Sequence, residues 1–206
     1  ERIGTPLKDW DVNIYYGIKT GLNEAFIIDT ATKEALCKAD PKSAEIIKPI
    51  LRGRDIQRYA YEWAGLWLIF IPWHFPLHHD ESIKGVSKQA EQAFETRYPH
   101  IYRHLLQFKP QLEQRNKAEV GIRYEWYALQ RCAATYYSEF EKEKVVWAET
   151  DQEMNLSFVP QGMFLQKTCF MIIGNRLKFI CGLLNSKISQ YIIRMKSSKL
   201  GEKGMS

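Results

Sequence analysis

The stretch KPILRGRDIQRY, residues 48–59, separates a predicted helix from predicted strands and concentrates positive charge. Four bases lie within eleven residues, and only Asp55 offsets them: Lys48, Arg52, Arg54 and Arg58. Their spacing fits neither a buried helix face nor an alternating strand, so we expect a loop. Gly53 lets the backbone turn between two arginines. The planar, permanently charged guanidinium group suits phosphates and guanine edges. A second interpretation stays open, in which these arginines pair with Asp55 and other acids.

The composition indicates a folded protein with a sizeable core. The chain has 206 residues, of which 45% are hydrophobic and 13% aromatic, which suits one large domain or one domain with an appendage. The longest apolar run, residues 66–73, is far shorter than a bilayer-spanning helix, so no membrane segment is expected. Four scattered cysteines without a C-x-x-C pair argue against zinc and a disulfide framework, and they favour a cytoplasmic location.

Positive charge is distributed unevenly. From Arg176 onward there are seven bases and one acid, giving +6, whereas residues 1–175 sum to −1 of the total of +5. We therefore expect a main domain over residues 1–175 and a helical segment over residues 176–206 that leads to a further module. That segment could follow a phosphate backbone, or its charges could be the solvated face of helices that pack on a partner. Because residue 1 is glutamate, we expect a piece of a longer protein.

Short strands and intervening helices predict the α+β class. The expected strands cover residues 12–19, 24–28, 59–64, 66–71, 144–149, 156–159 and 168–173, the first two forming a hairpin or two successive strands. Asp29 and Asp40 are expected helix caps, and Pro110 should kink or split the helix that Pro99 opens. Two further helices are expected over residues 176–185 and 187–196.

The motifs for catalysis and metal binding are absent or incomplete. Residues 17–21 lack the first glycine of a phosphate-binding P-loop, although Lys19, Thr20 and Asn23 could donate to phosphates or bases from a turn. An ordinary hairpin turn is the alternative. His100 and His104 lack a third ligand, so no metal is expected. The aromatic group at residues 124–127 could stack on bases or pack in the core.

Five ordered segments carry a family likeness. They are IYYGIKTGLNEAFIID (14–29), DPKSAEIIKPILRGRDIQRY (40–59), EWYALQRC (125–132), EFEKEKVVWAE (139–149) and LKFICGLLNSKISQYII (177–193). Together they resemble the C-terminal specificity domain of TaqI-like adenine-N6 DNA methyltransferases, which occurs in single-chain type II restriction–modification enzymes. The sequence departs from the family at Glu143, where a proline is usual, and at Pro110.

The resemblance implies a target recognition domain with a twisted, partly β-helix-like mixed sheet and C-terminal helices. It also implies that the catalytic half lies elsewhere. The family holds the target amine with an [N/D/S]-P-P-[Y/F/W] motif, but no two prolines are adjacent here, and the F-x-G-x-G cofactor turn is absent. We therefore expect no cofactor and no methylation in this fragment. The resemblance places S-adenosylmethionine in a methyltransferase domain on the N-terminal side of the same chain. It implies that the full-length parent enzyme is an adenine-N6 DNA methyltransferase, with or without endonuclease activity.

The expected partner is double-stranded DNA. Arg52, Arg54 and Arg58 are the first candidates to contact it, and at least one should read a base edge. Four residues are expected mainly as phosphate anchors: Lys19, Thr20, Asn23 and Lys144. Two alternatives remain: a module of a multi-subunit restriction system that docks on another protein through its basic helices, and a free-standing nuclease.

Overall fold

The computed structural model describes residues 5–6, 9–75, 82–83, 85–133, 135–150, 153–196, 199–200 and 204–205. The chain forms two compact units and passes between them four times. Unit 1 comprises residues 1–17, 51–64 and 138–206, and unit 2 comprises residues 18–50 and 65–137. The boundary expected after residue 175 concerns the modular layout of the protein and stays a prediction.

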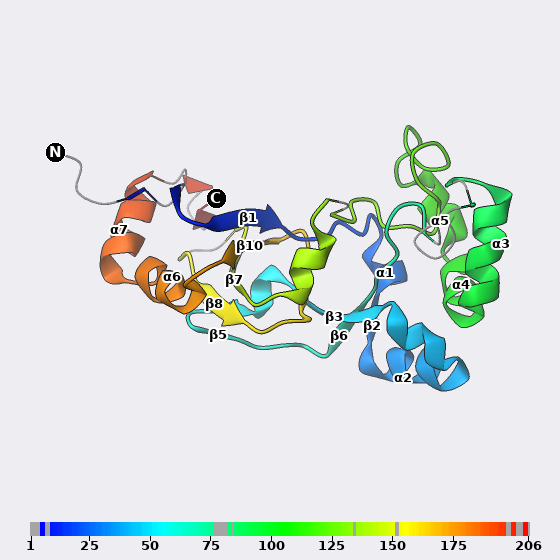
Figure 1. The fold of residues 1–206 in the computed structure, drawn as a ribbon, viewed down its shortest axis with the longest axis horizontal. Helices are drawn as coiled ribbons and strands as arrows, with labels where there is room; N and C mark the ends of the chain where they lie inside the picture. Colours follow the sequence, from blue (N-terminus) through cyan, green and yellow to red (C-terminus); the bar gives the residue numbers. More distant parts are fainter. Residues whose placement is uncertain are drawn as a thin grey trace. The chain divides into compact units, whose positions relative to one another are not determined.

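Unit 1 is built on an antiparallel four-stranded sheet (Figure 1). Its strands, in spatial order, are β1 (Val12–Tyr16), β10 (Cys169–Gly174), β7 (Lys144–Ala148) and β8 (Leu156–Val159). Helices α6 (Leu177–Leu184) and α7 (Lys187–Lys196) follow β10. One face of the sheet packs against α6, because Val145 and Ile172 share a buried cluster with Ile180. The strands predicted near residues 144–149, 156–159 and 168–173 and both C-terminal helices are confirmed.

Several further short elements lie in unit 1 or at its boundary with unit 2. They are the 3-10 turns η3 (Gly53–Asp55) and η4 (Tyr137–Glu141) and the strands β4 (Ile56–Gln57), β5 (Ala60–Tyr61), β9 (Phe164–Leu165), β11 (Lys199–Leu200) and β12 (Gly204–Met205). Strands β4 and β5 pair with each other as a tight hairpin.

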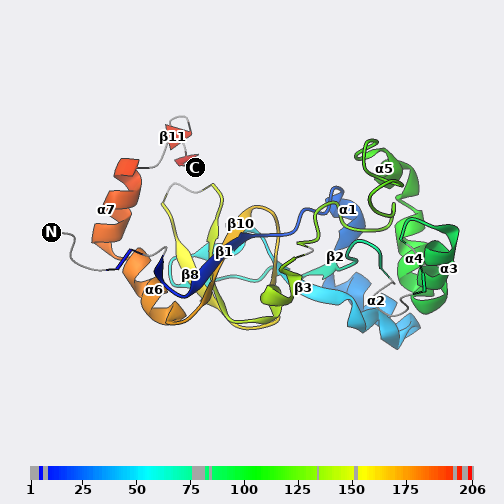
Figure 2. The same ribbon diagram turned by 45° about the horizontal axis from the view of Figure 1, so that its top comes forward.

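Unit 2 combines a small sheet with helices (Figure 2). Strands β2 (Ile27–Asp29), β6 (Leu66–Ile69) and β3 (Ile47–Leu51) lie in this order with antiparallel pairing. The helical elements are α1 (Asn23–Phe26), α2 (Thr30–Ala39), η2 (Pro41–Glu45), α3 (Lys88–Arg97), α4 (Pro99–Leu106) and α5 (Lys109–Gln114). Aromatic side chains fill the core, where the rings of Phe94 and Tyr127 stack with centroids 4.5 Å apart.

Several helix ends lie where capping residues and a proline in the sequence predict them. Asp29 accepts a hydrogen bond from the Thr32 N–H at 2.8 Å, and hydrogen bonding by the Thr32 side chain and then by its backbone lowers the pKa of the Asp29 carboxyl. Asp40 accepts from the Lys42 N–H at 3.1 Å and caps η2. Pro110 does split the helix, since α4 ends at Leu106 and α5 begins at Lys109. Both caps and the split are therefore confirmed.

Residues 12–19 and 24–28 are predicted as a hairpin or as two successive strands, and of these alternatives the hairpin is wrong. Strand β1 pairs with β10, and β2 pairs with β6. Glu24 and Ala25 favour a helical turn, and α1 buries Ala25 and Phe26 in unit 2. Ladder partners so distant in sequence leave no local signal. The α+β class itself is confirmed.

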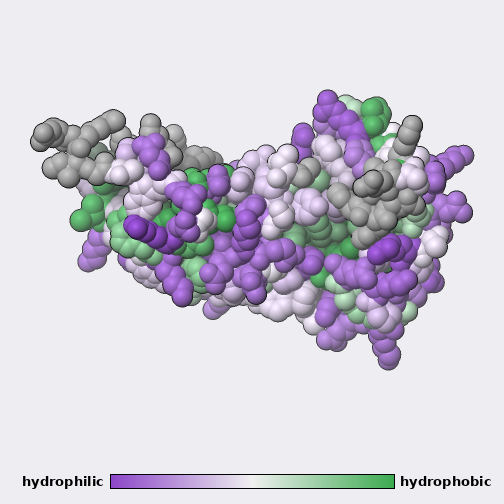
Figure 3. All heavy atoms as spheres, viewed as in Figure 1, coloured by the Kyte–Doolittle hydropathy of each residue, from purple (hydrophilic) through white to green (hydrophobic). Residues whose placement is uncertain are grey.

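Apolar side chains reach the surface on the C-terminal helices. Figure 3 shows green spheres there beside the purple, hydrophilic ones. The exposed members are Phe179, Leu183, Ile188, Tyr191, Ile192 and Met195. In the part of the chain that the structure describes, no helix has the length and apolar character to cross a membrane.

Candidate nucleic-acid interface

The basic segment begins with a compact turn that is fixed by backbone approach. Gly53 donates its N–H to Thr168 Oγ1 at 3.1 Å. A Cβ atom at this position would meet the Thr168 carbonyl oxygen at 3.0 Å and the Ala148 Cβ at 3.3 Å. A side chain at position 53 would therefore be tightly crowded, because the turn lies close to Thr168 and Ala148 within unit 1.

Arg52 is held by Asp55. Its Nε and Nη2 atoms donate to the Asp55 carboxylate, the shortest contact being 2.6 Å, and its backbone N–H donates to Asp55 Oδ2 at 2.8 Å. Asp55 is buried, so breaking this pair would leave a desolvated carboxylate. For Arg52 the structure matches the second interpretation, in which the arginine serves the fold.

Arg54 and Arg58 are both exposed, in different ways. Among the described residues, Arg54 makes no hydrogen bond or ion pair, so its whole guanidinium is available to a ligand. Arg58 Nη2 donates to the carbonyl oxygen of Asn185 at 2.6 Å, at the C-terminal end of α6, where a cation is favoured. A guanidinium has five N–H donors, so Arg58 can hold the Asn185 carbonyl oxygen and still donate to a ligand.

Tyr59 is a feature that the sequence interpretation missed. It follows Arg58 in the two-residue turn between β4 and β5, with a φ of 65°. Such turns favour Asn and Gly, and a left-handed conformation costs other residues about 1–2 kcal/mol. Tyr59 is 55% exposed, and the Arg58 guanidinium lies 5.3 Å from the centroid of its ring. The sequence signal for this turn was the short spacing of two strand-like pairs, residues 56–57 and 60–61, which only two residues separate.

Lys144 lies inside unit 1. Its side chain has no exposed surface, and its Nζ donates to the Phe140 carbonyl oxygen at 2.8 Å, with the Pro160 carbonyl oxygen at 3.5 Å. Burial lowers the pKa of Lys144 to about 8. A phosphate cannot reach this ammonium without opening the sheet, so the structure does not support the anchor expected here.

Lys19, Thr20 and Asn23 belong to unit 2. The backbone of Lys19 pairs with that of Arg131, through N–H to oxygen distances of 3.1 and 2.9 Å. Thr20 is buried and its hydroxyl donates to Asn23 Oδ1 at 2.7 Å, whereas Lys19 and Asn23 are exposed. Thr20 therefore shapes the turn, and only Lys19 and Asn23 can meet a ligand from it.

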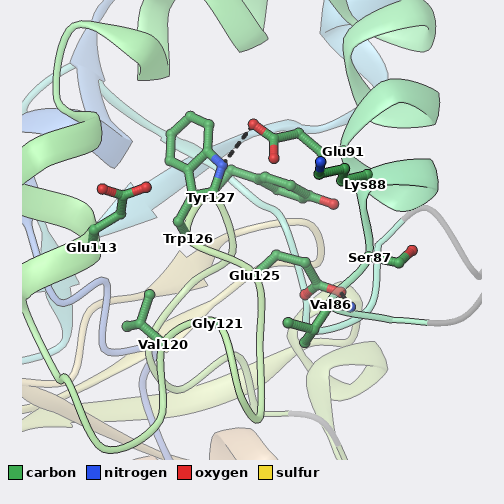
Figure 4. A pocket seen from close by; sticks show the side chains of 10 residues that line it. All are labelled: Val86, Ser87, Lys88, Glu91, Glu113, Val120, Gly121, Glu125, Trp126 and Tyr127. Carbon is green, nitrogen blue, oxygen red and sulfur yellow. Dashed lines mark hydrogen bonds between the residues drawn. The ribbon is translucent and has the colours of Figure 1, made fainter.

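Unit 2 also contains a pocket of about 370 Å³ with an acidic lining (Figure 4). Its carboxylates come from Glu91, Glu113 and Glu125. Glu125 accepts the N–H groups of His74 and Val86, each at 2.9 Å. Carboxylates repel phosphate, so this pocket is unsuited to a DNA backbone.

Glu91 in this pocket is committed to neighbouring side chains. Its Oε1 accepts from Trp126 Nε1 at 2.9 Å, the Tyr102 hydroxyl at 2.9 Å and Lys109 Nζ at 3.1 Å. Burial acts to raise the pKa of Glu91, but hydrogen bonds from Trp126, Lys109 and Tyr102 outweigh it and leave the pKa lowered. Trp126 and Tyr127 are buried, so the aromatic group packs in the core.

The histidine pair on α4 has no metal-binding geometry. His104 Nε2 lies 3.0 Å from the Ala25 carbonyl oxygen, and burial lowers the pKa of its ring. His100 lies beside Arg103 on the same helix. Within the described ranges, no group of three or more His, Cys, Asp and Glu side chains could hold a metal ion.

Comparison with known proteins adds to this geometry. Residues 48–204 match the model of the TaqI-like C-terminal specificity domain. A type II methyltransferase, M.MjaIV of Methanocaldococcus jannaschii, is 24% identical over 113 residues, which cover 55% of this chain and 32% of that protein.

Two solved structures are also similar. One is the type IIL restriction–modification enzyme MmeI in complex with DNA, with a TM-score of 0.45, 15% identity, and coverage of 84% of this chain and 20% of that one. The other is the type IIG restriction endonuclease BpuSI, with a TM-score of 0.39, 12% identity, and coverage of 85% and 19%. The chain spans about a third of the curated relative and about a fifth of each solved chain.

Proposed function

Because the chain belongs to the TaqI-like C-terminal specificity domain family, we propose that it is the DNA target recognition domain of a restriction–modification adenine-N6 DNA methyltransferase. It does not catalyse by itself. The parent binds S-adenosylmethionine in a methyltransferase domain on the N-terminal side and acts in the cytoplasm. The observation that carries the proposal is the family match, which includes the basic segment with its exposed Arg54 and Arg58.

In this mechanism the domain holds duplex DNA while the methyltransferase domain receives a flipped adenine. Flipping costs a few kcal/mol, which contacts with the flanking DNA must offset. Arg54 and Arg58 supply such contacts from unit 1, and Lys19 and Asn23 supply phosphate contacts from unit 2. Arg52, in contrast, keeps the loop in shape through Asp55.

The proposal is tested by titrating salt. Affinity for a duplex of mixed sequence, measured by fluorescence anisotropy, should fall as salt rises because bound phosphates release counterions. Arg54→Ala should weaken binding and lower the slope of log affinity against log salt by about one. Lys142→Ala is the matched control, since Lys142 is an exposed unit 1 cation paired with Glu139. Salt-independent binding, or an Arg54→Ala variant that binds like the unaltered chain, would contradict the proposal.

A docking module is the second candidate. It is favoured by the exposed apolar side chains of α6 and α7, in a stretch with five bases and no acid between residues 176 and 196. Large exposed apolar groups of this kind mark interaction sites. This function predicts a stable complex with another restriction subunit without DNA, and size-exclusion chromatography of the mixture distinguishes the two.

A further inference from the structure

The tip of the β4–β5 hairpin combines backbone strain with exposure. Gln57 pairs with Ala60, so Arg58 and Tyr59 form the whole turn. Tyr59 has a φ of 65°, in the region that glycine and asparagine adopt most readily. A bulky residue kept in a strained conformation at an exposed position indicates a function for its side chain.

The hydrogen bonds that hold this turn in place do not involve the Tyr59 ring. The backbone holds the turn, because the Tyr59 N–H donates to the Leu156 carbonyl oxygen at 2.9 Å. Arg58 adds its bond to the Asn185 carbonyl oxygen at 2.6 Å. Among the described residues, the ring has no hydrogen bond and no aromatic partner, its one ring interaction is with the Arg58 guanidinium, and 55% of Tyr59 is exposed. The ring is therefore available for a ligand.

The surroundings of the ring fit a nucleic acid. An aromatic ring can stack on any base, and adjacent guanidinium groups can hold phosphates. Arg58 lies over the ring, and the unpaired Arg54 lies in the preceding turn η3. In paired DNA the base faces are covered, but local unstacking or flipping of a neighbour exposes one.

We propose that Tyr59 is a base-stacking residue. Its ring covers the face of a nucleobase that unstacking exposes in the duplex, while Arg54 and Arg58 hold neighbouring phosphates. The proposal rests on the proposed function as a DNA target recognition domain and adds a contact residue to it.

The test compares two synthetic duplexes of the same sequence, one fully paired and one with a central unpaired aminopurine, a fluorescent base analogue. Tyr59→Asn removes the ring and keeps a residue that tolerates positive φ. Tyr59→Phe keeps the ring without the hydroxyl. Thermal melting should show that Tyr59→Asn folds with an unchanged or higher Tm, and Tyr59→Gly serves as a second ring-free variant.

The unaltered chain should bind the duplex with the unpaired base about tenfold more tightly and quench its fluorescence. Tyr59→Phe should keep both effects, and the ring-free variants should lose both. If Tyr59→Asn keeps them, if Tyr59→Phe loses them equally, or if the ring-free variants weaken binding to both duplexes alike, stacking on a base is overturned. If the unaltered chain binds neither duplex, the proposed function fails first and the stacking role fails with it.

Discussion

Arg54 in unit 1 and Arg115 in unit 2 show how differently the same side chain is used. Arg54 has no partner among the described residues. Arg115 donates to the carbonyl oxygens of Thr20 at 2.8 Å and Trp126 at 3.0 Å, and also to that of Ala128. Burial lowers the pKa of Arg115 to about 10. Clustered positive charge in a sequence is therefore a weaker guide to a binding surface than the partners each cation finds.

Replacing Arg115 should have the largest effect. Arg115→Ala removes donors from three backbone carbonyls in unit 2, so we expect the free energy of unfolding to fall by about 3–5 kcal/mol. Urea denaturation followed by circular dichroism measures the change. The control is Arg123→Ala, since this arginine is 65% exposed and forms a surface ion pair with Glu119. Equal stability of the two variants would show that Arg115 contributes nothing beyond a surface charge.

Arg52 and Arg54, on either side of Gly53, show the same contrast between an arginine held by the fold and one that is not. Arg52→Ala leaves the buried Asp55 carboxylate without its ion pair, so we expect a loss of about 2–3 kcal/mol in unfolding free energy. Arg54→Ala should change it by less than about 0.5 kcal/mol. Denaturation curves of both variants test the division, and a destabilised Arg54→Ala variant would contradict the view of Arg54 as a free surface cation.

Lys144 should give a smaller effect than Arg115 or Arg52, and one that depends on pH. Its pKa is about 8 in the folded chain, below that of an exposed lysine. Above that pH the folded chain loses the proton while the unfolded chain keeps it, so stability should rise by about 1–2 kcal/mol between pH 8 and pH 10. Lys144→Met should abolish this rise and Lys142→Met should retain it, as Tm values across this pH range will show.

The sequence predicted those features that depend on neighbouring residues. Asp29 and Asp40 cap their helices, and Pro110 separates α4 from α5, because each acts within one helical turn. The pairing of β1 with β10 could not be predicted, since its partners lie at opposite ends of the sequence.

The same division holds for the candidate site. Asp55 lies three residues from Arg52, so their pairing could be anticipated as an alternative. The burial of Lys144 could not be anticipated, because it follows from the position of β7 between β10 and β8 in the sheet, which only the fold establishes. Tyr59 was missed because its strained backbone contradicts the local preferences on which sequence interpretation relies.

The repeated passage of the chain between the units limits how new variants can arise. Unit 2 is assembled from residues 18–50 and 65–137, and residues 51–64 between them belong to unit 1. A single crossover between related genes therefore cannot transfer either unit whole. A chimaera that inherits a foreign unit 2 has to exchange two separate segments and retain the fourteen residues between them, which include Arg54, Arg58 and Tyr59.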